Sequence, residues 1–487
     1  MFERYVYEQS AAQYLNRIML VDCDNLEDRT HYSSCFVAHG FNVVRYIDDL
    51  HFRIFHFDEI KSSTEKYAVI VKADAYVPYD VRVVFSMFEV SYTKLFPRLN
   101  STVLQKAQSI NLDLLCSAYR NCFSDFHISQ LTEQFIQRDV YGKDNVRQYI
   151  AASVKTLTDM VSSASGYVDW FQISEAKATI DIMATQYDIP AQTEHIQPAF
   201  IDFILSSFGK LSAKMSKDTP VLVSKAMEYM RDQSEKFVVI VMDGMSQFDW
   251  DILSGSFSNI TYEKTNMFAM IPTTTSVSRQ CLLSNKYPSQ LFEPWKQSKE
   301  KTEFLECAKS LGYMPEQIEY ARGYDVDFSS VIRCGAIIIN EIDDMVHGQK
   351  QGRLGMYNDI SVMAKQAKLA ALVQRLLKAG FDVYVTADHG NVPCQGTGKL
   401  MKTGVETETK SRRMLVLKDF ADKEGLLSQH QLIDYPKYYL SKEFDYLICK
   451  AGQSFDAKGE DVMTHGGITI DEVIVPFIKI KAVDNNG

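Results

Sequence analysis

The chain has 487 residues, of which 46% are hydrophobic and 23% are charged, as in an ordinary globular protein. Its net charge of −10 argues against a surface that coats nucleic acid, and its nine single cysteines, with no CxxC pair, argue against a disulfide framework or a cysteine-rich zinc module. Residues 1–5 lack the pattern of a signal peptide, and no apolar run is long enough to span a bilayer. We therefore expect a cytoplasmic protein of two or three domains with no membrane partner.

Residues 1–99 are predicted to form a small α/β domain. Helix-length stretches separate three apolar segments, which we interpret as parallel strands at residues 17–22, 41–46 and 67–72. Asp22, Asp24 and Asp74 follow the first and third strands. They could form a phospho-acceptor pocket like that of response-regulator receivers, but the later strands that such a fold needs are replaced by helical sequence. We therefore favour the interpretation that these aspartates cap the following helices.

Residues 100–235 are predicted to be a helical connector or scaffold region. Glycine and proline are sparse in this region. Helical spacing, or a proline in the first turn, predicts helices near residues 112–119, 146–150, 198–211 and 220–233. No motif here indicates chemistry, so the sequence leaves the role of this region open.

The α/β pattern returns in residues 236–487, where apolar strands end in side chains that suit a metal ion. Strands are expected at residues 237–244, 337–340, 381–387 and 473–480, with a long helix at about residues 360–379. The polar residues at or after the first three strands are Asp243, Asp343, His347, Asp388 and His389, and His465 lies in a glycine-rich loop before the last strand. Because parallel strands place their carboxyl ends at one edge of a sheet, that edge is the expected site.

Taken together, these three aspartates and three histidines predict a metal site. Asp343 and His347 lie four residues apart, so on a helix they share one face and can bind the same ion. A lone strand-end aspartate usually caps a helix, and a lone histidine is usually a satisfied polar residue. That explanation weakens when three of the ten histidines are placed in this way. The donor types suit zinc or manganese and, without cysteine, exclude a closed structural zinc site.

A nucleophile is available in the segment Ile271-Pro-Thr-Thr-Thr-Ser-Val-Ser-Arg279. Its hydroxyls could simply cap the helix that follows. Alternatively, a hydroxyl at a helix N-terminus is well placed for catalysis, because backbone N–H groups stabilise an anion there. A nearby dication would lower the pKa of that hydroxyl further.

The ordered motifs resemble those of the alkaline phosphatase superfamily, and more narrowly those of PglZ-domain proteins. They are Val-Met-Asp243-Gly, Pro-Thr-Thr-Thr275, Asn-Glu-Ile-Asp343-Asp-Met-Val-His347, Thr-Ala-Asp388-His389-Gly-Asn391 and Thr-His465-Gly-Gly. They extend over residues 237–480, about half of the chain. The resemblance implies an α/β fold in which an alkaline-phosphatase-like catalytic domain, a mostly parallel sheet between helices, follows the small α/β domain and the helical region.

The same resemblance implies two divalent metal ions, with zinc favoured and manganese as the alternative. One ion would be held by Asp343, His347 and His465, and the other by Asp243, Asp388 and His389. Family members place the nucleophile three residues after the proline, so Thr275 is preferred to Thr273 and Thr274, and its hydroxyl would reach the metals. Arg279, one turn further on, is a candidate phosphate contact or a surface helix arginine, and Asn391 is a second candidate substrate contact.

The implied function is a metal-dependent phosphohydrolase that forms a phosphothreonine intermediate, which water then hydrolyses. PglZ-domain relatives include phosphodiesterases and nucleases linked to bacterial anti-phage systems, so a nucleotide or nucleic-acid phosphodiester is the favoured substrate. A phosphomonoesterase is a second possibility. A phosphomutase is weaker, because about 235 residues precede the Asp-Gly strand and threonine replaces serine. A non-catalytic scaffold with protein partners in a defence complex is an alternative of a different class, although every expected ligand is present.

Overall fold

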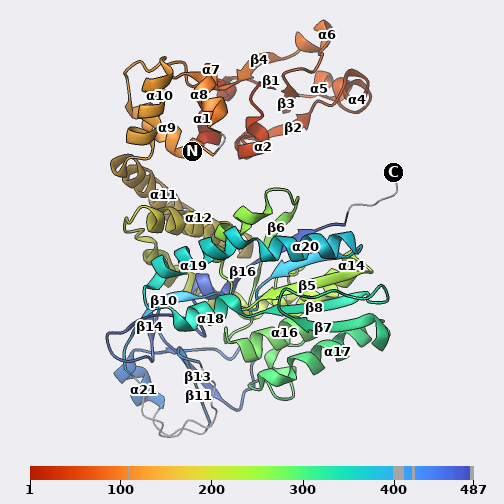
Figure 1. The fold of residues 1–487 in the computed structure, drawn as a ribbon, viewed down its shortest axis with the longest axis vertical. Coiled ribbons are helices and arrows are strands. Elements are labelled where there is room, and N and C mark those ends of the chain that lie inside the picture. Colours follow the sequence, from red (N-terminus) through yellow and green to blue (C-terminus); the bar gives the residue numbers. More distant parts are fainter. Residues whose placement is uncertain (108, 399–410, 419–422, 483–487) are drawn as a thin grey trace. The chain divides into compact units, whose positions relative to one another are not determined.

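The computed structural model describes residues 1–107, 109–398, 411–418 and 423–482. It divides into two compact units, Met1–Ala152 and Ser153–Gly487, which can be followed by colour in Figure 1. The finer division at residues 99/100 and 235/236 stays a prediction. Within the described ranges, no helix is both long enough and apolar enough to cross a bilayer.

The first unit contains a four-stranded parallel sheet with the order β2-β3-β1-β4. Its strands are β1 (Arg17–Asp22), β2 (Phe41–Arg45), β3 (Lys66–Lys72) and β4 (Ser86–Val90). The sequence predicted the first three but not β4, because only one of the five β4 residues is buried and the apolar signal is weak. Asp22 accepts 2.8 Å hydrogen bonds from the backbone N–H groups of Leu26 and Glu27, which supports its interpretation as a capping residue.

Helices dominate the middle of the chain, in agreement with the predicted pattern. They include α8 (Ser101–Lys106), α9 (Leu112–Asn121), α10 (Ser129–Phe135), α11 (Lys143–Ser163), α12 (Tyr167–Gln186), α13 (Gln197–Ser207) and α14 (Ala226–Gln233). The last two are shorter than predicted. Residues 208–213 and 223–225 form 3-10 turns instead, and Val221 adopts a left-handed φ of 39°, which delays the start of α14.

A six-stranded sheet with the order β6-β16-β9-β5-β8-β7 forms the core of the second unit. Its strands are β5 (Phe237–Met242), β6 (Glu263–Phe268), β7 (Ile318–Arg322), β8 (Cys334–Ile339), β9 (Asp382–Thr386) and β16 (Ile474–Ile480). All run parallel except β16, which pairs antiparallel with β6 and β9. Every residue of β5 is buried, as expected for the centre of a sheet that is covered on both faces.

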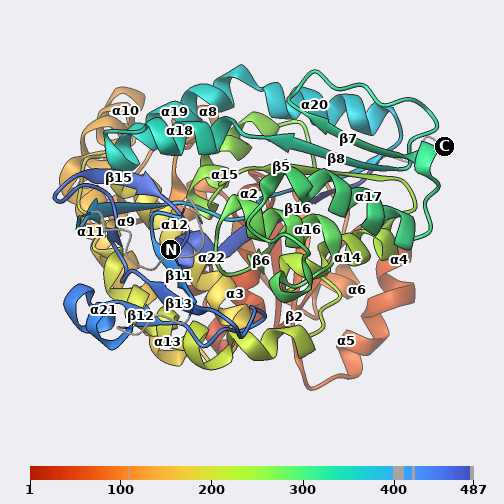
Figure 2. The same cartoon turned by 90° about the horizontal axis from the view of Figure 1, so that it is seen from below.

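Helices cover both faces of this sheet. Figure 2 shows α19 (Gly352–Gln366) and α20 (Lys368–Lys378) on one side, and α16 (Gln280–Ser284) and α17 (Glu300–Ser310) on the other. The single helix predicted at residues 360–379 is therefore two helices. Ala367 separates them with a left-handed φ of 52°, a break that helical periodicity does not reveal.

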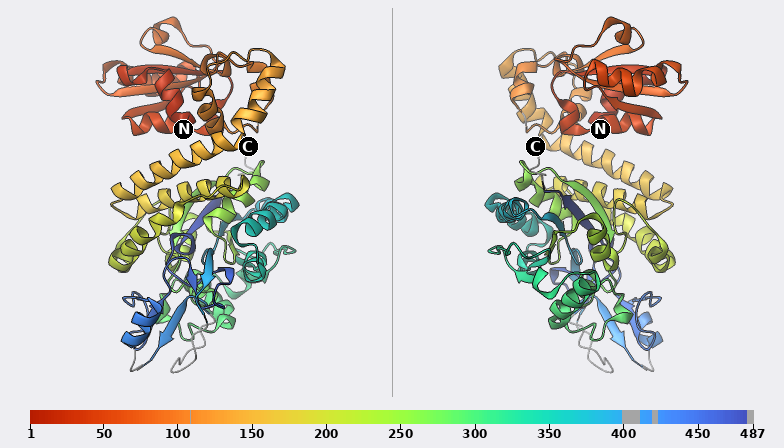
Figure 3. Two further views of the ribbon diagram at one scale, coloured as in Figure 1. Left: turned by 90° about the vertical axis from the view of Figure 1, so that its left-hand side faces the viewer. Right: turned by 90° about the vertical axis from the view of Figure 1, so that its right-hand side faces the viewer.

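Two small sheets follow β9 in the chain. One contains β10 (Val392–Gly396), β14 (Gln453–Ser454) and β15 (Asp461–Thr464), and the other contains β11 (Met414–Leu417), β12 (Ile433–Asp434) and β13 (Asp445–Ile448). Figure 3 shows the second small sheet beside α21 (Lys423–His430). The first matters for the site, because β10 leaves the carboxyl end of β9 and its partner β15 leads into His465.

Candidate metal centre

The six predicted ligands gather at the carboxyl edge of the large sheet. Asp243 follows β5, and Asp388 and His389 follow β9, its neighbour on one side. On the other side, β8 leads into α18 (Glu341–Gly348), which carries Asp343 and His347 on one face. His465 follows β15. Sequence-distant residues meet here because β5 lies between β8 and β9 in the sheet.

Three of these residues, Asp243, Asp388 and His389, form a buried ligand group. Their side chains are at most 2% exposed, and His389 Nε2 lies 3.8 Å from Asp243 Oδ1 and 3.8 Å from Asp388 Oδ2. Asp388 Oδ1 accepts backbone hydrogen bonds from Gly244 (3.2 Å) and His389 (3.1 Å). His389 Nδ1 lies 3.0 Å from Gly390 O. Donation through Nδ1 leaves Nε2 as a lone-pair donor that faces both carboxylates.

The other three, Asp343, His347 and His465, form an open ligand group. Their side chains are 16%, 40% and 10% exposed, respectively. Asp343 Oδ2 lies 3.4 Å from His347 Nε2, and Asp343 Oδ1 lies 3.5 Å from His465 Nε2. The Nδ1 atom of His465 lies 2.9 Å from Thr273 O, so this imidazole also presents Nε2 to the carboxylate.

The two groups adjoin, and their residues fit divalent cations. The rings of His389 and His465 stack with centroids 4.2 Å apart. Within each group the potential ligand atoms lie within 4.8 Å of one another. Among the described residues, neither Asp388 Oδ2 nor Asp343 Oδ1 has a hydrogen-bond partner, although both atoms are buried. Such orphaned oxygens are costly unless a cation satisfies them, and mixed carboxylate and imidazole donors suit borderline dications.

Protonation equilibria in the two groups differ. Burial, together with the charge of Asp388, raises the pKa of Asp243 to about 8, and burial raises the pKa of Asp388 to about 6. Burial also lowers the pKa of His465 to about 3, helped by His389. For Asp343 the upward effect of burial is outweighed by the hydrogen bond with His347 and the nearby imidazoles, so its pKa is lowered. His465 is therefore neutral and Asp343 ionised, the forms that bind metals.

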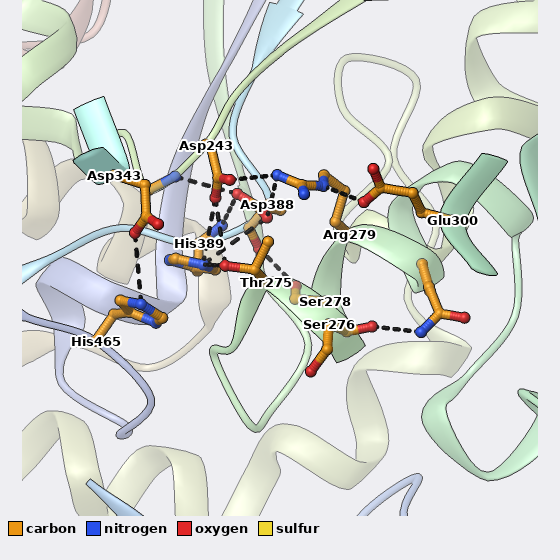
Figure 4. A network of polar contacts seen from close by, with 12 residues as sticks. Asp243, Thr275, Ser276, Ser278, Arg279, Glu300, Asp343, Asp388, His389 and His465 are labelled. Carbon is orange, nitrogen blue, oxygen red and sulfur yellow. Dashed lines mark hydrogen bonds and ion pairs between the residues drawn. The ribbon is translucent and has the colours of Figure 1, made fainter. Parts of the chain in front are cut away.

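Of the three candidate nucleophiles, only Thr275 faces the ligands. Its Oγ1 lies 3.4 Å from Asp243 Oδ1 and 3.2 Å from His389 Nε2, and Figure 4 shows the hydroxyl pointing between them. Thr275 is partly exposed, whereas Thr273 and Thr274 are at most 4% exposed. Thr273 Oγ1 already bonds the Gly466–Gly467 backbone. Thr275 opens a helical run that continues into α16, as the sequence predicted.

Arg279 lies inside the fold, against two buried carboxylates of the site. The interpretation as a surface arginine is wrong, because the side chain is completely buried. Its Nη1 donates a 2.5 Å hydrogen bond to Asp243 Oδ2 and lies 3.7 Å from Asp388 Oδ2, while its Nε donates a 2.6 Å bond to Glu300 Oε2 (Figure 4). The guanidinium thus neutralises the buried carboxylates, and the phosphate contact stays a prediction.

Glu300, the other partner of Arg279, was missed by the sequence interpretation. Its second oxygen accepts hydrogen bonds from Tyr320 and Arg322, so the carboxylate is fully engaged although it is buried. It begins α17, 21 residues after Arg279. An acidic residue in the first turn of a helix is common, so nothing local marks it as part of the site.

Asn391 holds two loops together. Its Nδ2 donates hydrogen bonds to Gly244 O (2.9 Å) and to Asp249 Oδ2 (2.6 Å). Ser246 caps α15 (Gln247–Leu253), and Asp249 completes that capping box by accepting hydrogen bonds from the Ser246 N–H and hydroxyl. The Ser-x-x-Asp spacing could have revealed that cap, although not its link to Asn391. These bonds fix the loop after β5, and they give no support to the predicted substrate contact of Asn391.

Comparison with known proteins places this arrangement in a family. Residues 222–480 match the model of the BREX system PglZ alkaline phosphatase-like domain. No match was found among the curated proteins. Among solved structures, murine ectonucleotide pyrophosphatase/phosphodiesterase 5 is 14% identical with a TM-score of 0.36, over 50% of this chain and 88% of that chain. Phosphonoacetate hydrolase from Sinorhizobium meliloti 1021, in complex with phosphonoformate, is 11% identical with a TM-score of 0.34, over 52% and 92%.

The family match begins 15 residues before β5 and ends with β16, so it contains the whole large sheet and all six candidate ligands. The predicted alkaline-phosphatase-like fold class is confirmed. An alkaline-phosphatase-like domain supports a hydrolase of the phosphoesterase type. Because the match covers more than half of the sequence, the chain belongs to the PglZ family.

Proposed function

We propose that this protein is a metal-dependent phosphodiesterase in which the Thr275 hydroxyl attacks phosphorus. The position of Thr275 Oγ1, 3.4 Å from Asp243 Oδ1 and 3.2 Å from His389 Nε2, carries the proposal. No other hydroxyl of the threonine triplet faces the ligand groups in the described structure. A nucleophile within hydrogen-bond reach of its activating groups is the arrangement that covalent phosphoryl transfer needs.

Two ions fit the donor sets, one held by Asp243, Asp388 and His389 and the other by Asp343, His347 and His465. When bound, dications supply the charge that neutralises phosphate oxygens and lowers the pKa of an attacking hydroxyl. Zinc is the proposed metal and manganese the alternative, since the carboxylate and imidazole donors suit both.

Three residues have separate roles in the proposed reaction: one reacts with the substrate and two hold the site in place. Thr275 Oγ1 forms a bond to phosphorus and loses its proton while the bond to one ester oxygen breaks, and that oxygen takes up a proton and leaves with its substituent as an alcohol. Water then attacks the phosphorus of the phosphothreonine, the bond to Thr275 Oγ1 breaks, the product leaves as a phosphomonoester, and a proton returns to the threonine hydroxyl. Arg279 keeps the carboxylates of Asp243 and Asp388 in place, and Asn391 fixes the loop that follows Asp243.

A nucleotide or nucleic-acid phosphodiester is the proposed substrate. The BREX description of the family supports a role in bacterial anti-phage defence, with protein partners in a defence complex. A cytoplasmic location is part of the same proposal. A phosphomonoester is the alternative substrate. A purely scaffolding role is not favoured, because the ligands are not only present but assembled in two groups.

The decisive experiment compares hydrolysis of bis-nitrophenyl phosphate and mono-nitrophenyl phosphate by the metal-loaded protein. Thr275→Ala should lower turnover by a factor on the order of 1,000 or more, because it removes the nucleophile, and should retain the bound metal, because the six carboxylate and imidazole donors remain. Thr275→Ser, which keeps a hydroxyl, is the matched control and should retain measurable activity. Undetectable turnover by metal-loaded wild-type protein would refute the enzyme proposal, and preference for the monoester would refute the diesterase.

A further inference from the structure

Glu472 is a completely buried glutamate on α22 (Ile470–Val473), the short helix that leads into β16. Its Oε2 accepts hydrogen bonds of 3.1 Å and 2.7 Å from the N–H and hydroxyl of Thr469, which is the capping box of this helix. Its Oε1 accepts a 2.8 Å hydrogen bond from the Gly467 N–H, which lies outside the cap. The capping box therefore explains one oxygen of the carboxylate and leaves the other to be explained.

The bond from Gly467 restrains the loop that carries His465, a ligand of the open group. Gly467 lies two residues after His465. Thr273 Oγ1 donates a 2.8 Å hydrogen bond to Gly467 O and accepts a 3.1 Å bond from the Gly466 N–H. The loop is thus held between the nucleophile segment and Glu472. A metal-binding imidazole keeps its orientation only when the groups around it are fixed, so both restraints bear on the ligand.

Arg413 pairs with Glu472 beside the same loop. Its Nε lies 3.5 Å from Glu472 Oε1, and neither side chain is exposed. A Cβ atom on Gly467 would lie 2.6 Å from Arg413 Nε and 2.9 Å from Glu472 Oε2, so the backbone packs directly against the ion pair. Arg413 is held in turn by a 2.6 Å hydrogen bond from its Nη1 to Cys394 Sγ on β10. The carboxylate that holds Gly467 is therefore itself held.

The backbone of α22 contacts the loop that follows His389, a ligand of the buried group. The Gly390 N–H donates a 2.9 Å hydrogen bond to Glu472 O. A Cβ atom on Gly390 would lie 1.9 Å from Asp471 O, so the two backbones touch. Asp471 Oδ1 accepts a 2.8 Å bond from Lys177 Nζ, which fastens α22 to α12. One short helix thus contacts a ligand-bearing loop from each of the two groups.

We propose that Glu472 is a positioning residue for metal binding. Its side chain orients His465 in the open group through Gly467, and its backbone carbonyl anchors the loop of His389 in the buried group. The proposal rests on the proposed function for the two ions and not for the substrate or the reaction. Because a substitution changes the side chain and keeps the carbonyl, it should weaken the binding of one ion and spare the other.

Glu472→Gln in the full-length protein tests this proposal, because the amide keeps the size of the side chain but cannot accept from all three donors. Glu472→Asp keeps the charge opposite Arg413 but is one methylene shorter, and it serves if the first variant does not fold. Glu27→Gln is the matched control. Glu27 is 3% exposed, accepts bonds from the N–H and hydroxyl of Ser33, and pairs with Arg45 at 3.3 Å. It lies on α2 (Leu26–Thr30), in the unit that supplies none of the six candidate ligands.

Zinc binding to the metal-free protein is measured by calorimetry, and His347→Ala identifies the binding step that belongs to the open group. Glu472→Gln and Glu472→Asp should each lower the affinity for the open-group ion about tenfold or more and keep that for the buried-group ion within about threefold of wild type. The free energy of unfolding is measured by chemical denaturation. Glu27→Gln should lose stability as Glu472→Gln does, and should bind both ions as wild type does.

Open-group affinity within about threefold of wild type in Glu472→Gln would overturn the proposal. Wild-type affinity in Glu472→Asp would also overturn it, because the charge alone would then suffice. An equal loss of affinity in Glu27→Gln would do the same, because ion binding would then follow stability. If wild-type protein binds both ions but hydrolyses neither nitrophenyl ester, the proposed function fails and these affinities still decide the role of Glu472. If wild-type protein binds no ion, both fail.

Discussion

The buried and open ligand groups use similar donors in opposite surroundings. Asp243, Asp388 and His389 are at most 2% exposed, and the two carboxylates share their environment with Arg279. In the open group, His347 is 40% exposed and Asp343 is surrounded by imidazoles. A buried group holds an ion tightly but needs it to offset carboxylate repulsion, whereas an open group can exchange its ion and admit substrate.

The largest difference should appear when one ligand is removed from each group. Asp388→Ala should abolish binding of one ion and lower turnover by a factor on the order of 1,000, because it takes a central carboxylate from a site that solvent cannot complete. His347→Ala should lower the affinity for the other ion on the order of 10–100-fold, because water can take the position that the imidazole leaves. Metal content and turnover are measured across a metal titration. Excess metal should restore turnover in His347→Ala but not in Asp388→Ala. Equal recovery of turnover in both variants would show that the two ligand groups do not differ in this way.

Arg279 offers a second way to sharpen the comparison, because it belongs only to the buried group. Arg279→Met leaves Asp243 buried without its arginine and takes from Glu300 one of its two arginine partners, which should lower the free energy of unfolding by about 3–5 kcal/mol. Denaturant unfolding is measured with and without metal. Added metal should recover part of the loss, since a dication replaces the missing charge beside Asp243. Arg353→Met, which removes a half-buried arginine paired with Asp181 and Asp471, is the control and should show no such metal-dependent recovery.

The pH dependence of stability should separate the groups as well. Burial raises the folded-state pKa of Asp243 to about 8 and that of Asp388 to about 6, both above the ordinary value for an aspartate of about 4. Between pH 4 and pH 8, roughly, these aspartates hold more protons in the folded metal-free protein than in the unfolded chain. The free energy of unfolding therefore falls as the pH rises through this range. One pKa unit corresponds to about 1.4 kcal/mol, so the expected loss is on the order of several kcal/mol for the two carboxyl groups together. Metal-free Asp388→Asn should lose less stability over this range and be more stable than wild type at pH 8. Stability is measured by thermal unfolding across this pH range. If it changes equally with pH in wild type and Asp388→Asn, Asp388 does not have a raised pKa.

The smallest effect is expected at Asn391, which touches the loops and not the ligands. Asn391→Ala removes two hydrogen bonds and should lower the free energy of unfolding by about 1–3 kcal/mol, because Asp249 Oδ2 loses a buried donor. Chemical denaturation measures the loss, and steady-state kinetics should show KM within about twofold of wild type. A large increase in KM without loss of stability would instead restore the substrate contact that the sequence suggested.

Much of the fold was accessible from local patterns. Strongly apolar strands such as β5 and β9 were predicted within two residues, whereas β4, with one buried residue, was missed. The break at Ala367 went unnoticed because both flanking helices keep a helical pattern and only the backbone φ changes. A hydrophobic pattern in the sequence indicates how buried a segment is. It gives no indication of a strand with few buried residues or of a helix that is broken by a single backbone dihedral angle.

The sequence by itself determined the kinds of donor and their local presentation. Strand ends supply Asp243 and Asp388, the four-residue spacing of α18 pairs Asp343 with His347, and a hydroxyl segment precedes a helix. Only the tertiary structure decided which donors are buried and that Arg279 turns inward to Glu300. The reason is physical: periodicity and capping act over a few residues, whereas burial and charge pairing arise when the sheet brings distant segments together.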